Sequence, residues 1–183
     1  VFEFSQHLYK PLVWFSQSRL QDFVKVSPVQ LNDGEKDFIH DLKSFYTANS
    51  DFLTGKELFL LRNSSRKGIG FFEANNFYPD FILWILEGDK QFIGFVDPKG
   101  LRQVEGLSNP KIQFHETIKT EIETKLNDKS ISLSSFIVSN TPFNQLRHWK
   151  GQESIDDFWK YNVCFQKEQK SIYVKRILER MMK

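Results

Sequence analysis

Three residues close together in the sequence, Asp80, Asp97 and Lys99, have the types and spacing that phosphate chemistry requires. Between the two acids lie nearly continuous apolar runs separated by Gly88 and Asp89. A Gly-Asp pair between such runs predicts a two-residue β-hairpin turn. With this turn Asp80 lies directly opposite Asp97, their Cβ atoms about 4.5–5.5 Å apart, and Lys99 lies on the same face. The turn alone therefore predicts a cluster of two carboxylates and one ammonium.

Two facing carboxylates repel and destabilise a strand pair unless a positive charge lies between them. Asp80 and Asp97 therefore predict a divalent cation, and oxygen ligands favour Mg²⁺ or Mn²⁺. Pro98 lacks the N–H of a central strand, which predicts a bulge or a strand end and frees its backbone carbonyl as a further metal ligand. In such a site a metal-activated water attacks phosphorus, and a charged Lys99 stabilises the transition state.

Glu35 is the next candidate, in a segment whose apolar spacing predicts a helix over residues 33–46. It precedes Phe38 by three residues and Leu42 by seven, so it belongs to the apolar stripe that faces the sheet. An inward carboxylate requires a partner, and the metal site would supply one directly or through water. Asn32 also forms a capping-box pattern with Glu35, so a purely structural role stays open.

Four basic residues around the acidic cluster are candidate contacts for DNA phosphates: Arg62, Arg66, Lys67 and Arg102. Exposed cations beside a phosphate-directed site could hold the substrate backbone, although most such charges are only solvated.

The rest of the chain predicts a single α/β (α+β) domain with a mixed central sheet flanked by helices. Strands are expected at 57–63, 68–72 and 130–140, and helices at 110–127, 143–164 and 171–182. We expect one domain over residues 1–183, with a lead-in at 1–30 and a catalytic core at 31–140. Residues 141–183 would form a basic helical C-terminal extension, with nine Lys and Arg against five acids.

Composition narrows the class of protein. The chain has 183 residues, 40% of them hydrophobic, which is enough for a well-buried core. Its single cysteine, Cys164, excludes internal disulfides and Cys-rich metal sites, and fits a cytoplasmic location. No stretch resembles a membrane span or signal peptide, so a soluble protein without a membrane partner is expected. The first residue is Val, which suggests a piece of a longer polypeptide.

The run ELFLLRNSSRKGIGFFEANNFYPDFILWI, followed by FVDPKGL, resembles the C-terminal endonuclease domain of type III restriction subunits and related DEAD/DEAH-box helicase–nuclease proteins. HLYKPL and SPVQLNDGEKDFIHDL look like the start of the same PD-(D/E)xK domain. The resemblance implies a restriction-endonuclease-like fold, with Asp80 and Asp97 as metal ligands, Lys99 beside the attacked phosphate and Glu35 as the acid of the first helix. It also implies an attached helicase. No GxxxxGK[ST] loop is present, so ATP would be used only by a helicase region outside this chain.

The expected function is therefore Mg²⁺-dependent endonucleolytic hydrolysis of DNA. Three alternatives stay open. The chain could be a catalytically silent module for DNA binding or assembly, or a small-molecule-binding α/β domain. It could also be a nuclease for RNA or for branched or single-stranded DNA.

Overall fold

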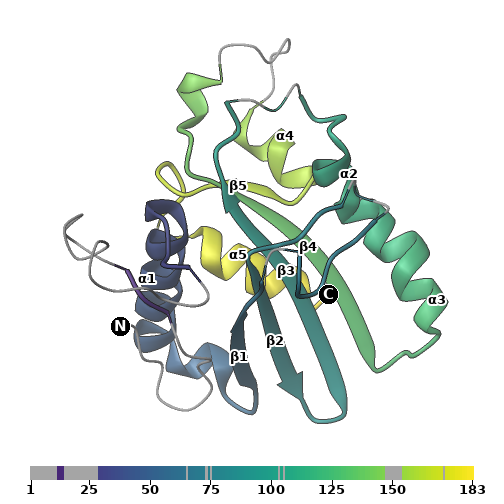
Figure 1. Cartoon of the computed structure of the whole chain (residues 1–183). Coiled ribbons are helices and arrows are strands. Elements are labelled where there is room, and N and C mark those ends of the chain that lie inside the picture. Colours follow the sequence, from purple (N-terminus) through teal and green to yellow (C-terminus); the bar gives the residue numbers. More distant parts are fainter. Residues whose placement is uncertain are drawn as a thin grey trace.

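The computed structural model describes residues 12–14, 29–64, 66–72, 74, 76–102, 104, 106–146, 154–170 and 172–183. This part of the chain is a mixed α/β structure with a five-stranded sheet in the order β1-β2-β3-β4-β5 and helices packed on it (Figure 1). The expected class, a mixed sheet flanked by helices, is confirmed. The expected lead-in at 1–30 lies almost wholly outside the described residues. No described helix combines the length and the apolar character needed to cross a membrane.

The sheet is antiparallel on one side and parallel on the other. Strands β1 to β3 pair antiparallel, whereas β3, β4 and β5 pair parallel. The predicted strands at 57–63 and 130–140 are confirmed. The strands are β1 (Glu57–Arg62), β2 (Phe81–Glu87), β3 (Lys90–Lys99), β4 (Ile131–Ser139) and β5 (Val163–Phe165).

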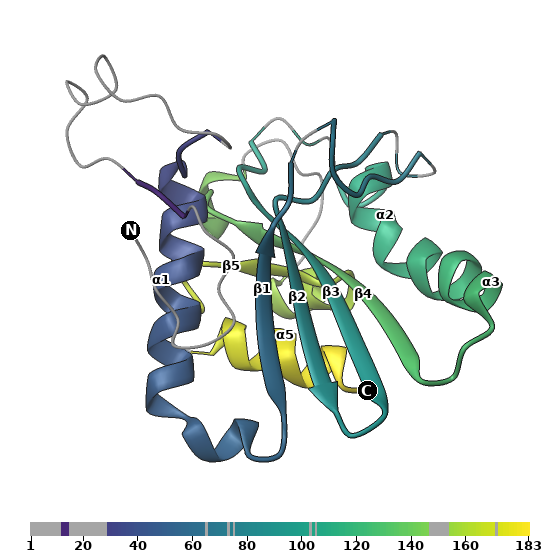
Figure 2. The same cartoon turned by 60° about the horizontal axis from the view of Figure 1, so that its bottom comes forward.

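Helices cover both faces of the sheet (Figure 2). One face packs against α1 (Asp33–Ala48) and α5 (Tyr173–Met181). The other packs against α2 (Pro110–Thr117) and the π-helical stretch Ile118–Glu123, which continues into α3 (Thr124–Leu126). The predicted helices at 33–46, 110–127 and 171–182 are thus confirmed. The remaining helical elements are the 3₁₀ turns Ser50–Leu53 and Phe143–Gln145 and the helix α4 (Ile155–Lys160).

The β2–β3 hairpin has the register that its turn predicts. Glu87 pairs with Lys90 and Phe81 with Val96, as a two-residue loop requires. Gly88 has a φ of 57°, the left-handed backbone that suits glycine at the first position of a type II′ turn.

The predicted continuous helix at 143–164 is wrong. Asn162 adopts a left-handed φ of 55° after α4, which ends the helix, and its Nδ2 donates to Ser135 O of β4 at 3.1 Å. The following residues, Val163–Phe165, form β5, a fully buried strand parallel to β4. A short buried strand is apolar at every position, so periodicity does not distinguish it from a buried helix. The C-terminal segment expected as a helical extension therefore completes the central sheet.

The predicted strand at 68–72 is also wrong. Asn63 Nδ2 donates to Ile69 O at 2.7 Å, and Gly68 N donates to Ser64 O at 2.7 Å, which closes a loop. Only an isolated bridge between Phe71 and Phe77 remains of the expected pairing. The polar side chain of Asn63 thus takes backbone groups that a strand would have used.

Candidate active site

Asp80 and Asp97 meet at the edge of the sheet where β2 begins. The last hairpin pair is Phe81 with Val96, and one step beyond it the same register brings Asp80 opposite Asp97. The two side chains share a hydrogen bond. Asn63 N donates to the backbone carbonyl of Asp80 at 2.8 Å, which holds this residue in line with the end of β1. The structure therefore brings together the pair of acids that the hairpin predicts.

The electrostatics of Asp80 reflect this crowding. Burial raises the pKa of Asp80 to about 8, and the negative charges of Asp97 and Glu35 and the hydrogen bond to Asp97 add to the rise. Arg62 opposes the rise. The crowding therefore favours the protonated form of Asp80, since two close carboxylates do not both ionise readily without a cation.

Lys99 joins the pair from the same strand. Its Nζ lies 3.4 Å from Asp97 Oδ2, and the Asp97 side chain is only 10% exposed. Between them, Pro98 pairs with Val138 of β4 without a bulge, next to the end of β3. Lys99 O accepts from Asn140 N at 3.1 Å on the β4 side, so the backbone of Pro98 points to the opposite side, where β2 has not begun. The missing N–H therefore removes no sheet hydrogen bond, and the strand-end alternative is the one the structure adopts.

Glu35 enters from the first turn of α1. It is 6% exposed, so the predicted inward orientation is confirmed. The capping box is also present: Glu35 N donates to Asn32 Oδ1 at 2.9 Å, and Asn32 N donates to Glu35 Oε2 at 3.0 Å. Burial raises the pKa of Glu35, Arg62 and the Asn32 N–H lower it, and Asp97 raises it. The Glu35 side chain therefore caps α1 and also lies close enough to the acids to affect their electrostatics.

Arg62 is the buried cation of this region. It is the last residue of β1, and its side chain is 8% exposed. Nη2 lies 3.1 Å from Glu35 Oε2 and donates to Gln30 O at 3.2 Å, and Nη1 donates to Val29 O. These protein partners hold the guanidinium in place, so Arg62 supplies the countercharge for the carboxylates.

The site draws on both faces of the sheet. Alternation along β3 places Asp97 on the face of Phe95, which packs in the core below α2. Arg62 instead pairs with Phe81, whose ring lies 5.4 Å from that of Phe38 in α1. Groups from the two faces are close only at the sheet edge, where the strands no longer separate them.

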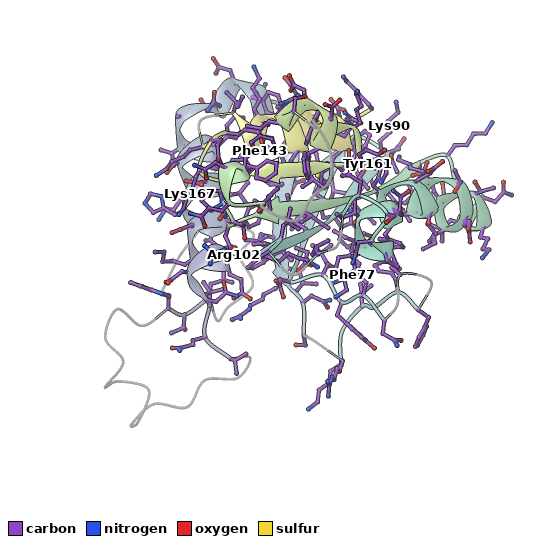
Figure 3. The ribbon with its side chains drawn as sticks, turned by 90° about the horizontal axis from the view of Figure 1, so that it is seen from above. Phe77, Lys90, Arg102, Phe143, Tyr161 and Lys167 are labelled. Carbon is purple, nitrogen blue, oxygen red and sulfur yellow. The ribbon has the colours of Figure 1, made fainter. Side chains whose placement is uncertain are left out.

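The other predicted cations lie outside this cluster. Arg66 and Lys67 are exposed in the loop between β1 and β2, and Arg66 has a left-handed φ of 63°. Arg102 is exposed after β3 and donates to Gln145 Oε1. In the view from above, Arg102 lies between Lys167 and Phe77 (Figure 3). Among the described residues, none of these three cations forms an ion pair with Asp80, Asp97 or Glu35.

Two positioning residues were not predicted. Asn63 Nδ2 donates to Pro79 O at 2.8 Å as well as to Ile69 O, so it fixes the peptide that precedes Asp80. Asn140 lies against Gly34, where an added Cβ would be 2.6 Å from Asn140 Nδ2, so glycine lets α1 approach the sheet edge. Each asparagine directly follows a strand, which is the sequence signal that could have identified both.

The residues present fit a hard divalent cation. Asp80 and Asp97 offer carboxylate oxygens, which Mg²⁺ and Mn²⁺ prefer, and a cation between them would relieve the repulsion that helps to raise the pKa of Asp80. Among the described residues no group of three or more His, Cys, Asp or Glu forms a ready-made metal centre. Mg²⁺ usually binds through one or two carboxylates and keeps several waters, so a pair of acids is sufficient.

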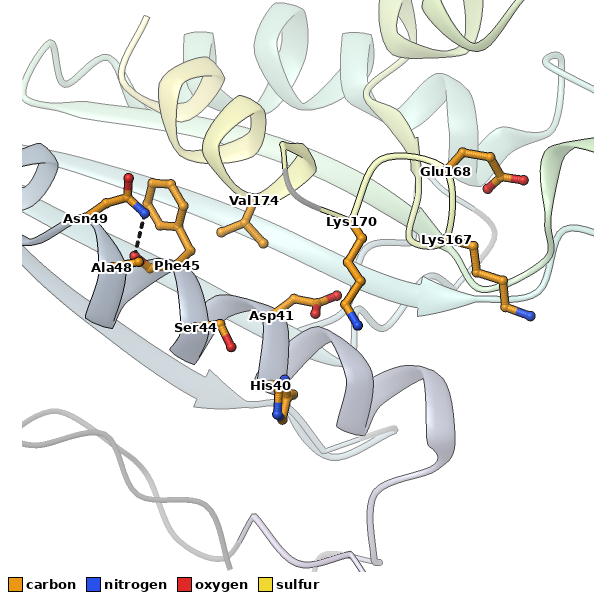
Figure 4. Close-up of a pocket in the computed structure, with 10 residues that line it drawn as sticks. All are labelled: His40, Asp41, Ser44, Phe45, Ala48, Asn49, Lys167, Glu168, Lys170 and Val174. Atoms are coloured by element: carbon orange, nitrogen blue, oxygen red, sulfur yellow. Dashed lines mark hydrogen bonds between the residues drawn. The ribbon is translucent and has the colours of Figure 1, made fainter.

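A separate groove of about 620 Å³ lies between α1 and the segment after β5 (Figure 4). His40 and Asp41 line it from α1, facing Lys167 and Lys170 across the groove. Asp41 Oδ2 accepts a hydrogen bond from Tyr173 at 2.9 Å, and burial raises the pKa of Asp41. Acids and bases are mixed along its walls, so the groove has no consistent preference for an anion or a cation.

Neither a protein-family model nor a curated protein sequence matches this chain.

Proposed function

We propose that this chain is a Mg²⁺- or Mn²⁺-dependent endonuclease domain of the PD-(D/E)xK type that hydrolyses DNA phosphodiester bonds. The proposal includes a restriction-endonuclease-like fold and action beside a helicase region of the same protein or complex, as in type III restriction enzymes. ATP would be used only by that helicase region. The site would work in the cytoplasm.

One observation carries the proposal: the hairpin register places Asp80 opposite Asp97 where β2 begins, with Lys99 Nζ 3.4 Å from Asp97 Oδ2. Asp97 is buried and Asp80 is half-buried, and two adjacent carboxylates in such surroundings destabilise a folded chain. A bound cation would neutralise this repulsion, so a cation-binding function would explain why the two acids are placed together. Active sites are also where such shifted pKa values concentrate.

The residues divide the chemistry between them. Asp80 and Asp97 would hold the cation, with the carbonyl of Pro98 as a further oxygen and Glu35 acting directly or through water. When bound, the cation would lower the pKa of a water molecule and neutralise charge on the phosphate. Lys99 keeps a positive charge beside the attacked phosphorus and stabilises the negative charge that develops there. Arg62 opposes the rise in the pKa of Glu35 and orients its carboxylate.

The test combines metal binding with DNA cleavage. Calorimetric titration with Mg²⁺ and Mn²⁺ and nicking of supercoiled plasmid are measured on the wild type, Asp80→Ala, Asp97→Ala and Lys99→Ala. We expect either Asp variant to lose metal binding and about 10³-fold or more of the nicking rate. Lys99→Ala should still bind metal but nick about 10²–10³-fold more slowly, as for a lost electrostatic stabiliser.

Two matched controls come from the other end of the same hairpin. Glu87→Gln removes a carboxylate from β2, and Lys90→Ala removes an ammonium from β3, without touching the acidic site. Both should bind metal and nick DNA as the wild type does. A wild type that binds no divalent cation, or nicking that survives all three site substitutions, would reject hydrolysis and favour the catalytically silent module.

A further inference from the structure

The loop between β1 and β2, residues 63–80, exposes apolar side chains directly beside the candidate site. Phe72 is 79% exposed and Ile69 is 47% exposed. The neighbouring Phe71 points the other way, with its ring centroid 4.8 Å from that of Phe95 and 4.5 Å from that of Phe114. One of two adjacent phenylalanines therefore anchors the loop in the core while the other is presented to solvent, where a large apolar side chain gains nothing from burial.

Asn63 joins Ile69 of this loop to Pro79, the residue before Asp80. Asn63 Oδ1 accepts from Ile69 N at 2.9 Å, and Asn63 Nδ2 donates both to Ile69 O and to Pro79 O. At its far end the bridge between Phe71 and Phe77 closes the loop. Because the same asparagine bonds Ile69 and the residue before Asp80, this part of the loop, three residues before Phe72, lies next to the acidic site.

The charge of the loop complements a nucleic acid. Arg66 and Lys67 are exposed, and in the sequence the loop carries one acid, Glu73, before Asp80. Cations that follow a phosphate backbone, combined with an exposed aromatic ring on which a base can stack, are the two components of single-strand recognition. A duplex offers phosphates to the cations but no free base face to the ring.

We propose that this loop binds a single-stranded or locally unpaired stretch of DNA next to the cleaved phosphodiester. Phe72 stacks on an unpaired base, and Arg66 and Lys67 contact phosphates of the same strand. This inference rests on the proposed nuclease function and narrows it, because it assigns a preference for DNA that is unpaired beside the site, such as a helicase would supply.

The test is binding of a fluorescent DNA oligonucleotide, single-stranded or annealed to its complement, followed by anisotropy in EDTA. Without divalent cation no cleavage can occur, so binding is scored separately from hydrolysis. We expect Phe72→Ala to weaken single-strand binding by about tenfold or more, as the loss of one base stack predicts, and to leave duplex binding within about twofold. Phe72→Trp should restore it. Arg66→Ala and Lys67→Ala should each reduce the salt dependence by about one phosphate contact.

Ile172→Ala is the matched control, because Ile172 is also an exposed apolar residue, at 49%, and precedes α5 away from the loop. It should bind both oligonucleotides as the wild type does. The proposal would be overturned if Phe72→Ala lost equal affinity for the single strand and the duplex, or if Ile172→Ala showed the same loss. It would also be overturned if the wild type bound no DNA measurably. As a further comparison, an RNA oligonucleotide of the same sequence is titrated, and tighter binding to this RNA would overturn the proposal too. If the wild type cleaves no DNA but shows the Phe72 effect, the loop assignment stands and the hydrolytic function fails.

Discussion

The two ends of the β2–β3 hairpin follow one register but carry opposite electrostatics. At the turn, Glu87 pairs with Lys90 across the ladder, and Glu87 Oε1 forms an ion pair with Lys56 Nζ at 3.0 Å. At the open end, the same ladder brings Asp80 opposite Asp97, two groups of like charge. The first end is stabilised as cross-strand pairs normally are. The second end needs further groups to offset the repulsion between the two acids.

The two ends of the hairpin differ in the groups that stabilise their charges. At the turn, water and the half-buried Lys56 are enough, since the Glu87 side chain is 44% exposed. At the open end Asp97 is buried and Asp80 is half-buried, and a charge removed from water requires a partner close by. Arg62 and Lys99 provide countercharge, and the raised pKa of Asp80 favours its protonated, neutral form. Removing a charged partner should therefore change the free energy of unfolding little at the turn and strongly at the open end.

Removal of the Arg62 guanidinium should give the largest difference in stability between the two ends of the hairpin. Arg62→Ala leaves Glu35 buried and unpaired, so we expect the free energy of unfolding to fall by about 3–5 kcal/mol. Lys56→Ala removes the cation at the turn and should cost less than about 1 kcal/mol. Urea denaturation measures both. The double variant Arg62→Ala/Glu35→Gln should recover part of the loss, and equal costs for Arg62→Ala and Lys56→Ala would contradict the comparison.

The pH dependence of stability should separate the two ends next. The folded pKa of Asp80, about 8, exceeds its ordinary value of 3.8, so the folded chain binds a proton that the unfolded chain releases. Without divalent cation, this contribution is fully present below about pH 4 and is lost as the pH rises to about 8. Even one pKa unit corresponds to about 1.4 kcal/mol. Thermal unfolding in EDTA across this range should show a shallower decline for Asp80→Asn than for the wild type, and identical slopes would exclude Asp80 as the titrating group.

Mg²⁺ should stabilise the open end alone. At ten times its dissociation constant the cation should raise the free energy of unfolding by about 1.4 kcal/mol. The gain should be larger at pH 8 than at pH 6, because the metal competes with the proton on Asp80. Differential scanning calorimetry with and without Mg²⁺ measures it. Asp97→Asn should abolish the gain and Glu87→Gln should keep it; an equal gain in all three chains would point to a cation bound elsewhere.

The smallest effect is expected at the turn. Glu87→Gln removes a partly exposed ion pair with Lys56 and should change the free energy of unfolding by less than about 0.5 kcal/mol. Urea denaturation at low and high salt checks this, since any contribution should be screened by salt. A loss above about 1 kcal/mol that persists at high salt would show that both ends depend on their charges.

Much of the fold could be predicted from local patterns. The helices at α1, α2 and α5 follow from apolar spacing and from caps such as Asn32 and Asn109, whose side chains accept backbone N–H groups of the first turn. Two predictions failed where long-range contacts override local pattern. Val163–Phe165 is a strand because β4 offers it an edge, and residues 68–72 are a loop because Asn63 takes their backbone groups.

The sequence was sufficient to place Asp80 opposite Asp97 and Lys99 beside them, because a two-residue turn and the two-residue period of a strand are local properties. It was also sufficient to place Glu35 on the inward side of its helix. Burial, and with it the raised pKa of Asp80, required the packed chain. So did the contacts across long separations: Glu35 with Arg62 and Gly34 with Gln166, whose Nε2 donates to Gly34 O at 3.0 Å. Such contacts depend on how whole elements pack, and no local spacing specifies that.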